Sequence, residues 1–532
     1  MNLNLALLLL FGSLIFIIYF IFPKKHRYLV LLIASYALFI TISKWLVIFL
    51  FITTLSIYVV GLIINNLNNK FQNEKDLIDE NQELDKDIKK ENKKALKNKY
   101  NKKKKLVMAL GVIFNVLTIV ILKYLNLFGE IFNGFFDLFH INYSIPTLFV
   151  LVPLGLSYYT LNAIGYIVDV YRGKFKADKN FLNVMLFMSY FPTILEGPFH
   201  SYDKLEPQLK EGHDFSYINM THGIQLVLFG MFKKMVVADR IDMITSEVFS
   251  NYGDYSSVII LAAILLYTLQ LYAEFSGIIE MVLGVSEMFG IKLNKNFDRP
   301  FFSKSVSEFW RRWHMSLGNW LKEYIFYPVS LNSSKKVSKK MLEKNHKFLS
   351  VFIPEALGLF CVWTICGLWH GPTVKYFIYG MYYYVLMILG ILIQEICSKF
   401  KGYESLKTKK GYIVFQIIRT FILVNIGMML FRAGTMTDFF KMFGGIFRSG
   451  GITNIVKTGV LDGYEVFVMI TSLIFLLIVD ILHFKYQNIR DEIDKKHIVL
   501  RWSLYFILAL AILYFGAYGP SYKPVDPIYG NF

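Results

Sequence analysis

The chain has 532 residues, of which 55% are hydrophobic and 18% charged, with a formal net charge of +18. Soluble domains average about 45–50% apolar and about 25% charged residues. The composition therefore excludes a disordered chain, a collagen-like repeat and an ordinary soluble enzyme. Repeated apolar runs of about 20 residues instead predict an all-α polytopic membrane protein. Cytoplasmic loops rich in Lys and Arg explain the positive charge, so we expect no nucleic-acid partner.

The first domain that we predict, residues 1–66, consists of membrane spans. The run Asn4–Phe22 is followed by Pro23-Lys24-Lys25-His26-Arg27. A signal peptide has its charges before the apolar stretch and a cleavage site after it. We therefore interpret this run as an uncleaved span with the N-terminus outside. Spans at Tyr28–Ile42 and Trp45–Ile64 follow and bring the chain inside.

A charged segment, residues 67–105, is the second predicted domain. Between Lys70 and Lys105 there are 13 Lys and 8 Asp or Glu. An apolar seam at helical spacing indicates a cytoplasmic helical arm; it comprises Leu77, Leu84, Ile88 and Ala95. One interpretation is a solvated linker that fixes the topology. The alternative is a surface that binds a partner protein or lipid headgroups.

Residues 106–518 are predicted to form the main membrane body, which brings the total to about 11–13 spans. The spans expected here are Leu106–Ile121, Ile145–Val168, Tyr217–Val237, Val258–Phe289, Leu349–His370, Tyr376–Ile396, Tyr412–Phe431, Val466–Phe484 and Val499–Tyr518. Shorter pieces at Phe181–Leu195 and Phe309–Tyr327 contain Pro, Gly or charge, which is typical of re-entrant segments beside a cavity or tunnel.

Three basic loops support one orientation of this body. They are Lys335–Lys347, Lys399–Lys410 and Lys485–Arg501, and all three fit on the cytoplasmic side. The last span then runs outward and places the tail, residues 519–532, outside.

Cysteine indicates no special chemistry. The three cysteines contain no CxxC pair, which argues against a disulfide framework and a zinc site. We expect them to be small buried apolar residues, and we expect no bound metal.

Ionisable residues in the apolar runs are the default functional candidates, because burying them in a membrane is costly. His314 lies in Trp310-Arg311-Arg312-Trp313-His314, where helical spacing places it on one face with Trp310 and Leu317. His370 ends an apolar run in Gly367-Leu368-Trp369-His370-Gly371-Pro372. An imidazole at such a helix end can accept a proton from an alcohol near neutral pH. For each histidine, a hydrogen-bonded structural role is the alternative.

Two buried carboxylates, Glu274 and Glu280, are six residues apart within one apolar run. This spacing places them on different faces of a helix, so we do not expect an acid/base pair. Two roles remain open: cation or proton sites in a transporter, or hydrogen bonds that pin helices together.

Five stretches together resemble the membrane-bound O-acyltransferase (MBOAT) family, and within it the bacterial alginate O-acetyltransferase branch. They cover most of the chain from Val152 to Gly371. They are VPLGLSYYTLNAIGYIVDVYRG (Val152–Gly173), FPTILEGPF (Phe191–Phe199), GMFKKMVVADR (Gly230–Arg240), LYAEFSGIIEMVLGVSEMFGIKLNKNFDRPFFSKSVSEFWRRWHMSLGNWLKEYIFYPVS (Leu271–Ser330) and GLWHG (Gly367–Gly371). The resemblance implies an MBOAT-type helical body around a central tunnel.

The resemblance also implies roles for residues. The family's near-invariant histidine matches His370, and a second one in the branch matches His314, so both are expected to be catalytic. Tunnel or donor-binding roles are expected for Arg311, Arg312, Trp313, Trp369 and Glu274. The branch usually has Asp where this chain has Glu274 and Glu280. The C-terminal PIYGNF, residues 527–532, resembles an aromatic motif of the branch. Tyr529 is therefore expected to relay the acyl group outside.

By this resemblance the chain is an O-acyltransferase of a bacterial cytoplasmic membrane. It is expected to move an acyl group, acetyl from acetyl-CoA, to a hydroxyl of an extracellular polysaccharide or to a secreted or membrane-anchored relay protein. The expected partners are these acceptors and membrane lipid; no bound cofactor is expected. His370 would take the hydroxyl proton, and His314 or nearby donors would stabilise the oxyanion or orient the thioester. The alternatives are D-alanyl transfer to teichoic acid from a carrier protein, and a transporter.

Overall fold

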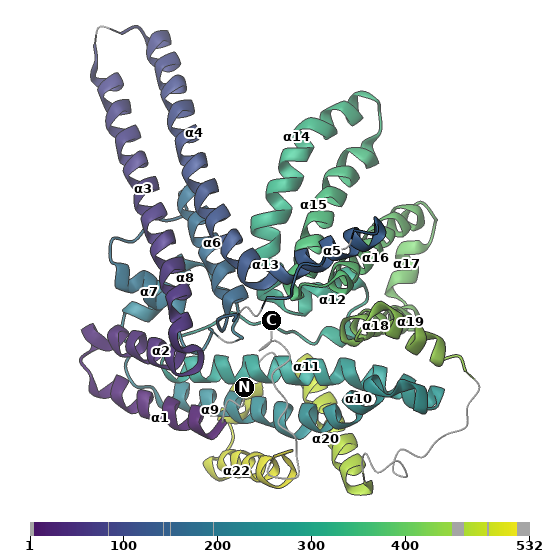
Figure 1. The fold of residues 1–532 in the computed structure, drawn as a ribbon. Coiled ribbons are helices and arrows are strands. Elements are labelled where there is room, and N and C mark those ends of the chain that lie inside the picture. Colours follow the sequence, from purple (N-terminus) through teal and green to yellow (C-terminus); the bar gives the residue numbers. More distant parts are fainter. Residues whose placement is uncertain are drawn as a thin grey trace. The chain divides into compact units, whose positions relative to one another are not determined.

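The computed structural model describes residues 5–82, 84–141, 143–148, 151–194, 196–448, 462–486 and 489–518, and every regular element in these ranges is a helix (Figure 1). They form two compact units, which separate between Phe215 and Ser216. Each unit is described by itself. The fold is that of a polytopic all-α membrane protein.

The first unit contains the helices up to residue 215. They are α1 (Leu5–Ile21), η1 (Lys24–His26), α2 (Arg27–Ser43), η2 (Lys44–Leu46), α3 (Val47–Glu80), α4 (Lys86–Ile119), η3 (Val120–Tyr124), α5 (Leu125–Leu138), α6 (Leu156–Arg172), α7 (Phe181–Ser189) and α8 (Tyr202–Lys210). Of these, η3 is a π-helix, whereas η1 and η2 are 3₁₀-helices.

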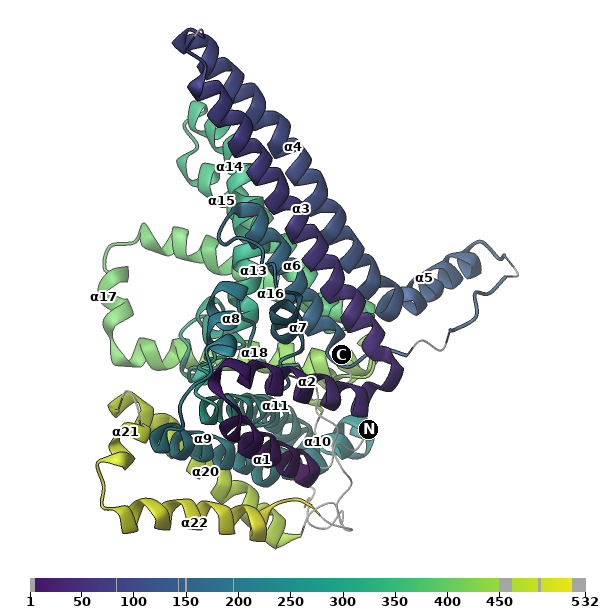
Figure 2. The same cartoon turned by 90° about the vertical axis from the view of Figure 1, so that its left-hand side faces the viewer.

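The charged segment forms a hairpin of two long helices, because α3 and α4 pack side by side and reverse direction between Glu80 and Lys86 (Figures 1 and 2). The predicted apolar seam is wrong. Leu77 and Ile88 are 66% and 49% exposed, because the helix stops between them and the periodicity does not continue through the turn. The rings of Phe71 and Tyr100 meet across the hairpin instead, 5.9 Å apart.

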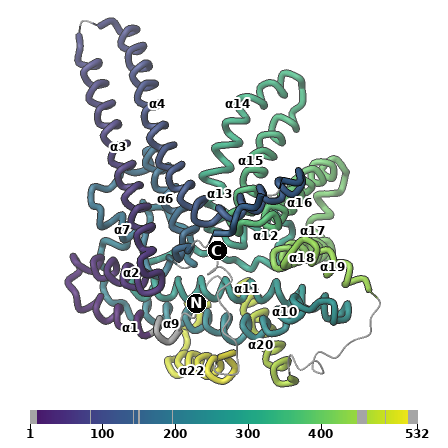
Figure 3. The backbone as a smooth tube through the Cα atoms, viewed as in Figure 1, coloured from purple at the N-terminus to yellow at the C-terminus, as the bar shows by residue number. Residues whose placement is uncertain are grey.

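The second unit contains the remaining helices (Figure 3). They are α9 (Tyr217–Met231), η4 (Phe232–Ala238), α10 (Asp239–Ser250), η5 (Tyr252–Asp254), α11 (Ser257–Met288), η6 (Pro300–Phe302), α12 (Val306–Arg312), α13 (Met315–Leu321), η7 (Lys322–Phe326), α14 (Tyr327–Glu343), α15 (Lys347–His370), α16 (Val374–Ser398), α17 (Tyr403–Thr408), α18 (Lys410–Arg432), α19 (Met436–Gly445), α20 (Gly463–Lys485), α21 (Ile489–Asp494) and α22 (Ile498–Phe515). Two of these, η4 and η7, are π-helices.

The 32-residue helix α11 packs along α9 through two facing pairs of glycines. Gly223 faces Gly284, and Gly230 faces Gly277. A Cβ atom added at Gly230 would lie 2.4 Å from the carbonyl oxygen of Gly277, and one at Gly284 would lie 2.5 Å from that of Gly223. Small residues at such contacts allow two helix backbones to approach closely.

Eight helical segments in the described ranges are long and apolar enough to cross a membrane. They are Lys24–Glu80, Lys86–Leu138, Ser257–Met288, Lys347–His370, Val374–Ser398, Lys410–Arg432, Gly463–Lys485 and Ile498–Phe515. The first of these segments includes both α2 and α3, and the second includes both α4 and α5. The chain is thus a multi-pass membrane protein.

Two sequence predictions need correction. The span expected at Ile145–Val168 is wrong in its first half, because α6 begins only at Leu156, after Pro153 and the left-handed Gly155; proline lacks the backbone donor that a helix needs. The basic loop expected at Lys335–Lys347 is mostly helical, since α14 continues to Glu343.

Candidate functional site

His370 is the last residue of α15 and is buried. Its ring lies among aromatic side chains, with centroids 4.9 Å from Trp369, 5.3 Å from Phe431 and 5.8 Å from Tyr379. The chain reverses after His370 and continues in α16, and helices α15 and α16 pack closely. A Cβ at Gly367 would lie 2.4 Å from the carbonyl oxygen of Tyr376.

His314 does not lie within a helix, so the predicted shared helical face is wrong. The helix ends at Arg312 and restarts at Met315, and His314 between them has the left-handed backbone angle φ = +47°. Such a conformation costs a non-glycine residue about 1–3 kcal/mol and persists where surrounding contacts enforce it. At His314 these contacts come from Asn296.

Asn296 binds the residues at this break and directly after it. Its carbonyl oxygen accepts from the Met315 N–H at 2.9 Å. Its side-chain Oδ1 accepts from the N–H of Ser316 at 2.9 Å and from the Ser316 hydroxyl at 2.8 Å, and it lies 3.2 Å from His314 Nδ1. On the other side of the break, the Asp298 N–H donates to the Arg312 carbonyl at 2.9 Å. Hydrogen bonds from Asn296 and Asp298, which precede η6, therefore hold the break between α12 and α13 in place.

The structure brings the two histidines together around Trp369. The Trp369 ring is 6.1 Å from that of His314 and 4.9 Å from that of His370, and Phe275 of α11 lies 4.8 Å from His314. Burial lowers the pKa of His314 well below its usual range, and the neighbouring His370 acts in the same direction. Both effects favour the neutral imidazole.

The other residues of the WRRWH segment have structural contacts. Trp313 is buried against the rings of Phe297 and Phe309, 5.1 Å and 5.4 Å away. Arg312 pairs with Glu308 at 2.7 Å along α12. Arg311 is exposed and donates to Ser307 at 2.8 Å. Of the three, only Trp313 reaches the aromatic cluster beside His314.

The carboxylates of Glu274 and Glu280 bind different lysines, as their spacing on α11 predicts. Lys234 Nζ lies 3.2 Å from Glu274 and 2.5 Å from Asp239. Lys233 Nζ lies 2.6 Å from Glu280 and 3.3 Å from the Ser276 hydroxyl. From the sequence, both lysines, together with Arg311 and Arg312, could attract CoA phosphates from the cytoplasm. Lys233 is buried and Lys234 is partly buried, and both are held in ion pairs, as charges away from water require. A role of the two lysines in binding CoA stays a prediction.

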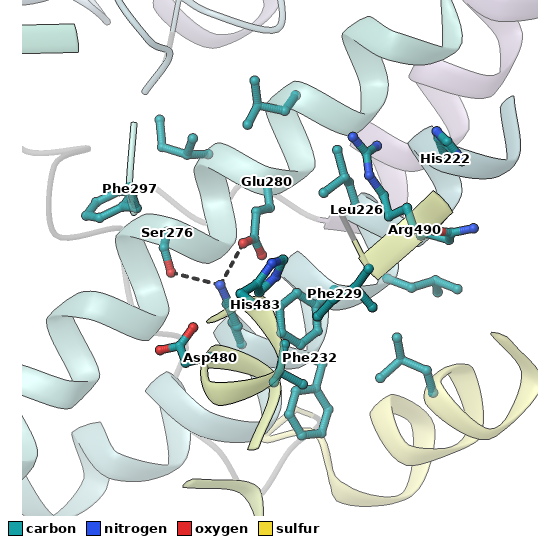
Figure 4. A pocket seen from close by; sticks show the side chains of 18 of the residues that line it. His222, Leu226, Phe229, Phe232, Ser276, Glu280, Phe297, Asp480, His483 and Arg490 are labelled. Atoms are coloured by element: carbon teal, nitrogen blue, oxygen red, sulfur yellow. Dashed lines mark hydrogen bonds and ion pairs between the residues drawn. The ribbon is translucent and has the colours of Figure 1, made fainter. Parts of the chain in front are cut away.

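A cavity of about 1380 Å³ lies in the second unit, between α9, η4, α11, residues 291–299, α20, α21 and α22. Figure 4 shows Ser276, Glu280, Asp480 and His483 gathered at its polar part, beside Phe229 and Phe232. Asn296, Phe297 and Tyr272 belong to its wall. Neither His314 nor His370 lines it, but its wall includes the residue that holds His314.

Comparison with known proteins identifies the domain. Residues 175–432 match the model of the membrane-bound O-acyltransferase family. The chain is 31% identical over 346 residues to the "Probable alginate O-acetylase AlgI" of Pseudomonas syringae, which covers 64% of this chain and 61% of the relative. This chain carries an MBOAT domain.

Two other relatives have different names. The peptidoglycan O-acetyltransferase of Helicobacter pylori is 28% identical, over 66% of this chain and 67% of the relative. The teichoic acid D-alanyltransferase of Bacillus subtilis is 28% identical, over 52% of this chain and 68% of the relative. The chain matches only 60–65% of the length of three alginate relatives from Pseudomonas.

The MBOAT domain contains the kinked segment, both histidines and Glu274. The cavity extends beyond it, because α20, α21 and α22 follow residue 432. Tyr529 lies outside the described residues. Asn296 lies within the family-like stretch Leu271–Ser330, but no periodicity or known role distinguished it there from its neighbours.

Proposed function

We propose that this protein is a membrane O-acyltransferase that uses His370 as its general base. The observation that carries the proposal is the packing of two buried histidines around Trp369 within the MBOAT domain. Burial away from water strengthens hydrogen bonds and electrostatic interactions at a reacting centre. The names of the relatives, which include O-acetyl and D-alanyl transferases, support an acyl group as the transferred unit.

The proposed reaction moves an acyl group from a thioester to a hydroxyl. His370 accepts the hydroxyl proton while the oxygen attacks the thioester carbonyl. A carbon–oxygen bond forms and the carbon–sulfur bond breaks. The thiolate leaves and takes the proton from the His370 imidazolium, so the products are an ester and a free thiol. Holding both reactants in a buried site replaces a bimolecular encounter with a positioned one.

We further propose acetyl-CoA as the cytoplasmic donor and an extracellular polysaccharide hydroxyl as the acceptor, in a bacterial cytoplasmic membrane with both termini outside. The relatives named for alginate and peptidoglycan acetylation support this choice. Tyr529 as an outer acyl relay, a separate acyl-handling protein and bound membrane lipid stay part of the proposal.

D-alanyl transfer from a carrier protein is the second candidate. The similarity to the Bacillus subtilis D-alanyltransferase favours it. The two candidates share the histidines and differ in the donor. Radiolabelled acetyl-CoA and a D-alanyl-loaded carrier protein, supplied to membranes that contain the protein, distinguish them by which label reaches the polymer.

The test of the proposed function is His370→Ala, with His346→Ala as the matched control at the exposed beginning of the same helix α15. We expect His370→Ala to reduce acyl transfer by at least about 100-fold, the usual lower contribution of a general base. His346→Ala should leave transfer unchanged. The ester content of the cell-surface polymer and the amount of each variant in the membrane are measured together. Normal ester content in the His370→Ala strain would reject the assignment.

A further inference from the structure

The hydrogen bonds of Asn296 determine which way its side-chain amide points. A backbone N–H only donates, and that of Ser316 lies 2.9 Å from the Asn296 atom placed as Oδ1. If the amide were flipped, its NH₂ group would face this N–H, and two donors would meet. The atom that faces Ser316 is therefore the oxygen, independent of how the amide was assigned.

This orientation determines the tautomer of His314. Its Nδ1 lies 3.2 Å from the same oxygen, which has no proton to give. The Nδ1 atom must then carry the proton and donate it. A neutral imidazole has one N–H, so the lone pair is on Nε2.

We propose that Asn296 is a positioning residue that fixes His314 in the Nδ1–H form, so that His314 acts in acyl transfer as a hydrogen-bond acceptor through Nε2. This inference rests on the proposed function for its catalytic part only. It differs from the oxyanion-stabilising role expected from the sequence, because a neutral His314 with its proton on Nδ1 has none on Nε2 to donate. The left-handed backbone at His314 also supports this tautomer, since it brings the His314 ring and Ser316 within hydrogen-bonding distance of the same Asn296 oxygen.

His370, on α15, is a titratable neighbour of His314. On α11, Glu274 precedes Phe275 but binds Lys234. Asp298 and Arg312 lie on the two backbone segments that pair beside the kink, and their side chains bind Arg299 and Glu308. The partner of Nδ1 is thus the neutral side-chain amide of Asn296.

The first test is spectroscopic and does not depend on activity. The full-length protein is labelled with ¹⁵N-histidine in lipid bilayers, and the His314 signals are assigned by their loss in His314→Gln. We expect a protonated Nδ1 and an unprotonated Nε2 at pH 7. A protonated Nε2 in the wild-type protein would overturn the proposal, whatever reaction the protein catalyses.

The second test is the pH profile of acyl transfer by Asn296→Asp, with Asn319→Asp on the exposed side of α13 as the control. The aspartate keeps the accepting oxygen but adds a negative charge about 3 Å from Nδ1 and favours the imidazolium. An opposite charge this close shifts a pKa by about 1–3 units. Because only neutral His314 accepts at Nε2, we expect the acidic limb of the profile to move to higher pH by at least about one unit.

Three outcomes are distinguishable. The shift in Asn296→Asp with an unshifted control supports the proposal. An unshifted limb in a folded, active Asn296→Asp variant overturns the catalytic role of His314, even if the tautomer is as expected. Loss of transfer in His370→Ala together with an Nε2–H tautomer would keep the proposed function and reject the role of Asn296.

Discussion

At the scale of single residues, the adjacent lysines of η4 show how positive charges inside the protein are stabilised. The π-helical turn places Lys233 and Lys234 against different carboxylates of α11. Lys233 also lies over the Phe229 ring, 4.6 Å from its centre. Each ammonium group is therefore compensated by a carboxylate on a neighbouring helix, and the compensation depends on both partners being present.

We predict that Lys233→Met destabilises the protein by about 3–5 kcal/mol, the usual cost of removing one partner of a buried pair. The change leaves Glu280 charged and without its ion-pair partner. The double variant Lys233→Met/Glu280→Leu should recover most of this loss, because no uncompensated charge remains. Thermal unfolding in detergent measures both. Equal stability of Lys233→Met and the wild type would show that this ion pair makes no net contribution.

At the scale of helices, the contact between α9 and α11 depends on the absence of side chains at four positions. We predict that Gly230→Ala costs about 1–3 kcal/mol, as overpacking does, because the added Cβ would lie 2.4 Å from a backbone oxygen of α11. Gly390→Ala on α16 is the control, since a Cβ there meets no atom within 4 Å. It should be neutral or slightly stabilising, because alanine favours helix.

Melting temperatures of the two glycine variants in the same detergent separate these effects. Comparable values for both would mean that α9 and α11 can move apart without loss. A lower value for Gly230→Ala alone would show that close backbone approach holds this part of the molecule together.

At the scale of the whole molecule, the charge predicts the orientation in the membrane. Much of the excess Lys and Arg lies in the arm formed by α3 and α4, in the second half of α14 and in the segments after α16 and α20. Such basic segments are retained in the cytoplasm. We predict that a cysteine introduced as Lys94→Cys reacts with an impermeant maleimide only in opened membranes, whereas Asn531→Cys reacts in intact cells. The background lacks Cys361, Cys366 and Cys397. Reaction of Lys94→Cys in intact cells would contradict the proposed orientation.

The sequence alone predicted the membrane class, the resemblance to the MBOAT family and the two candidate histidines, because apolar runs and the motifs around His314 and His370 are local signals. The separation of Glu274 from Glu280 also followed from helical spacing. These features depend on residues close together along the chain, so periodicity and motifs are sufficient to predict them.

Only the tertiary structure decided how the site is built. The break at His314 comes from Asn296, 18 positions away, and the partners of the two lysines come from a different helix. Trp369 lies beside both histidines because Trp310 of α12 and His314 after it pack against aromatic rings of α15. Such contacts depend on how distant segments fold onto each other. A hydrogen bond between distant residues produces no periodic pattern in the sequence that could predict it.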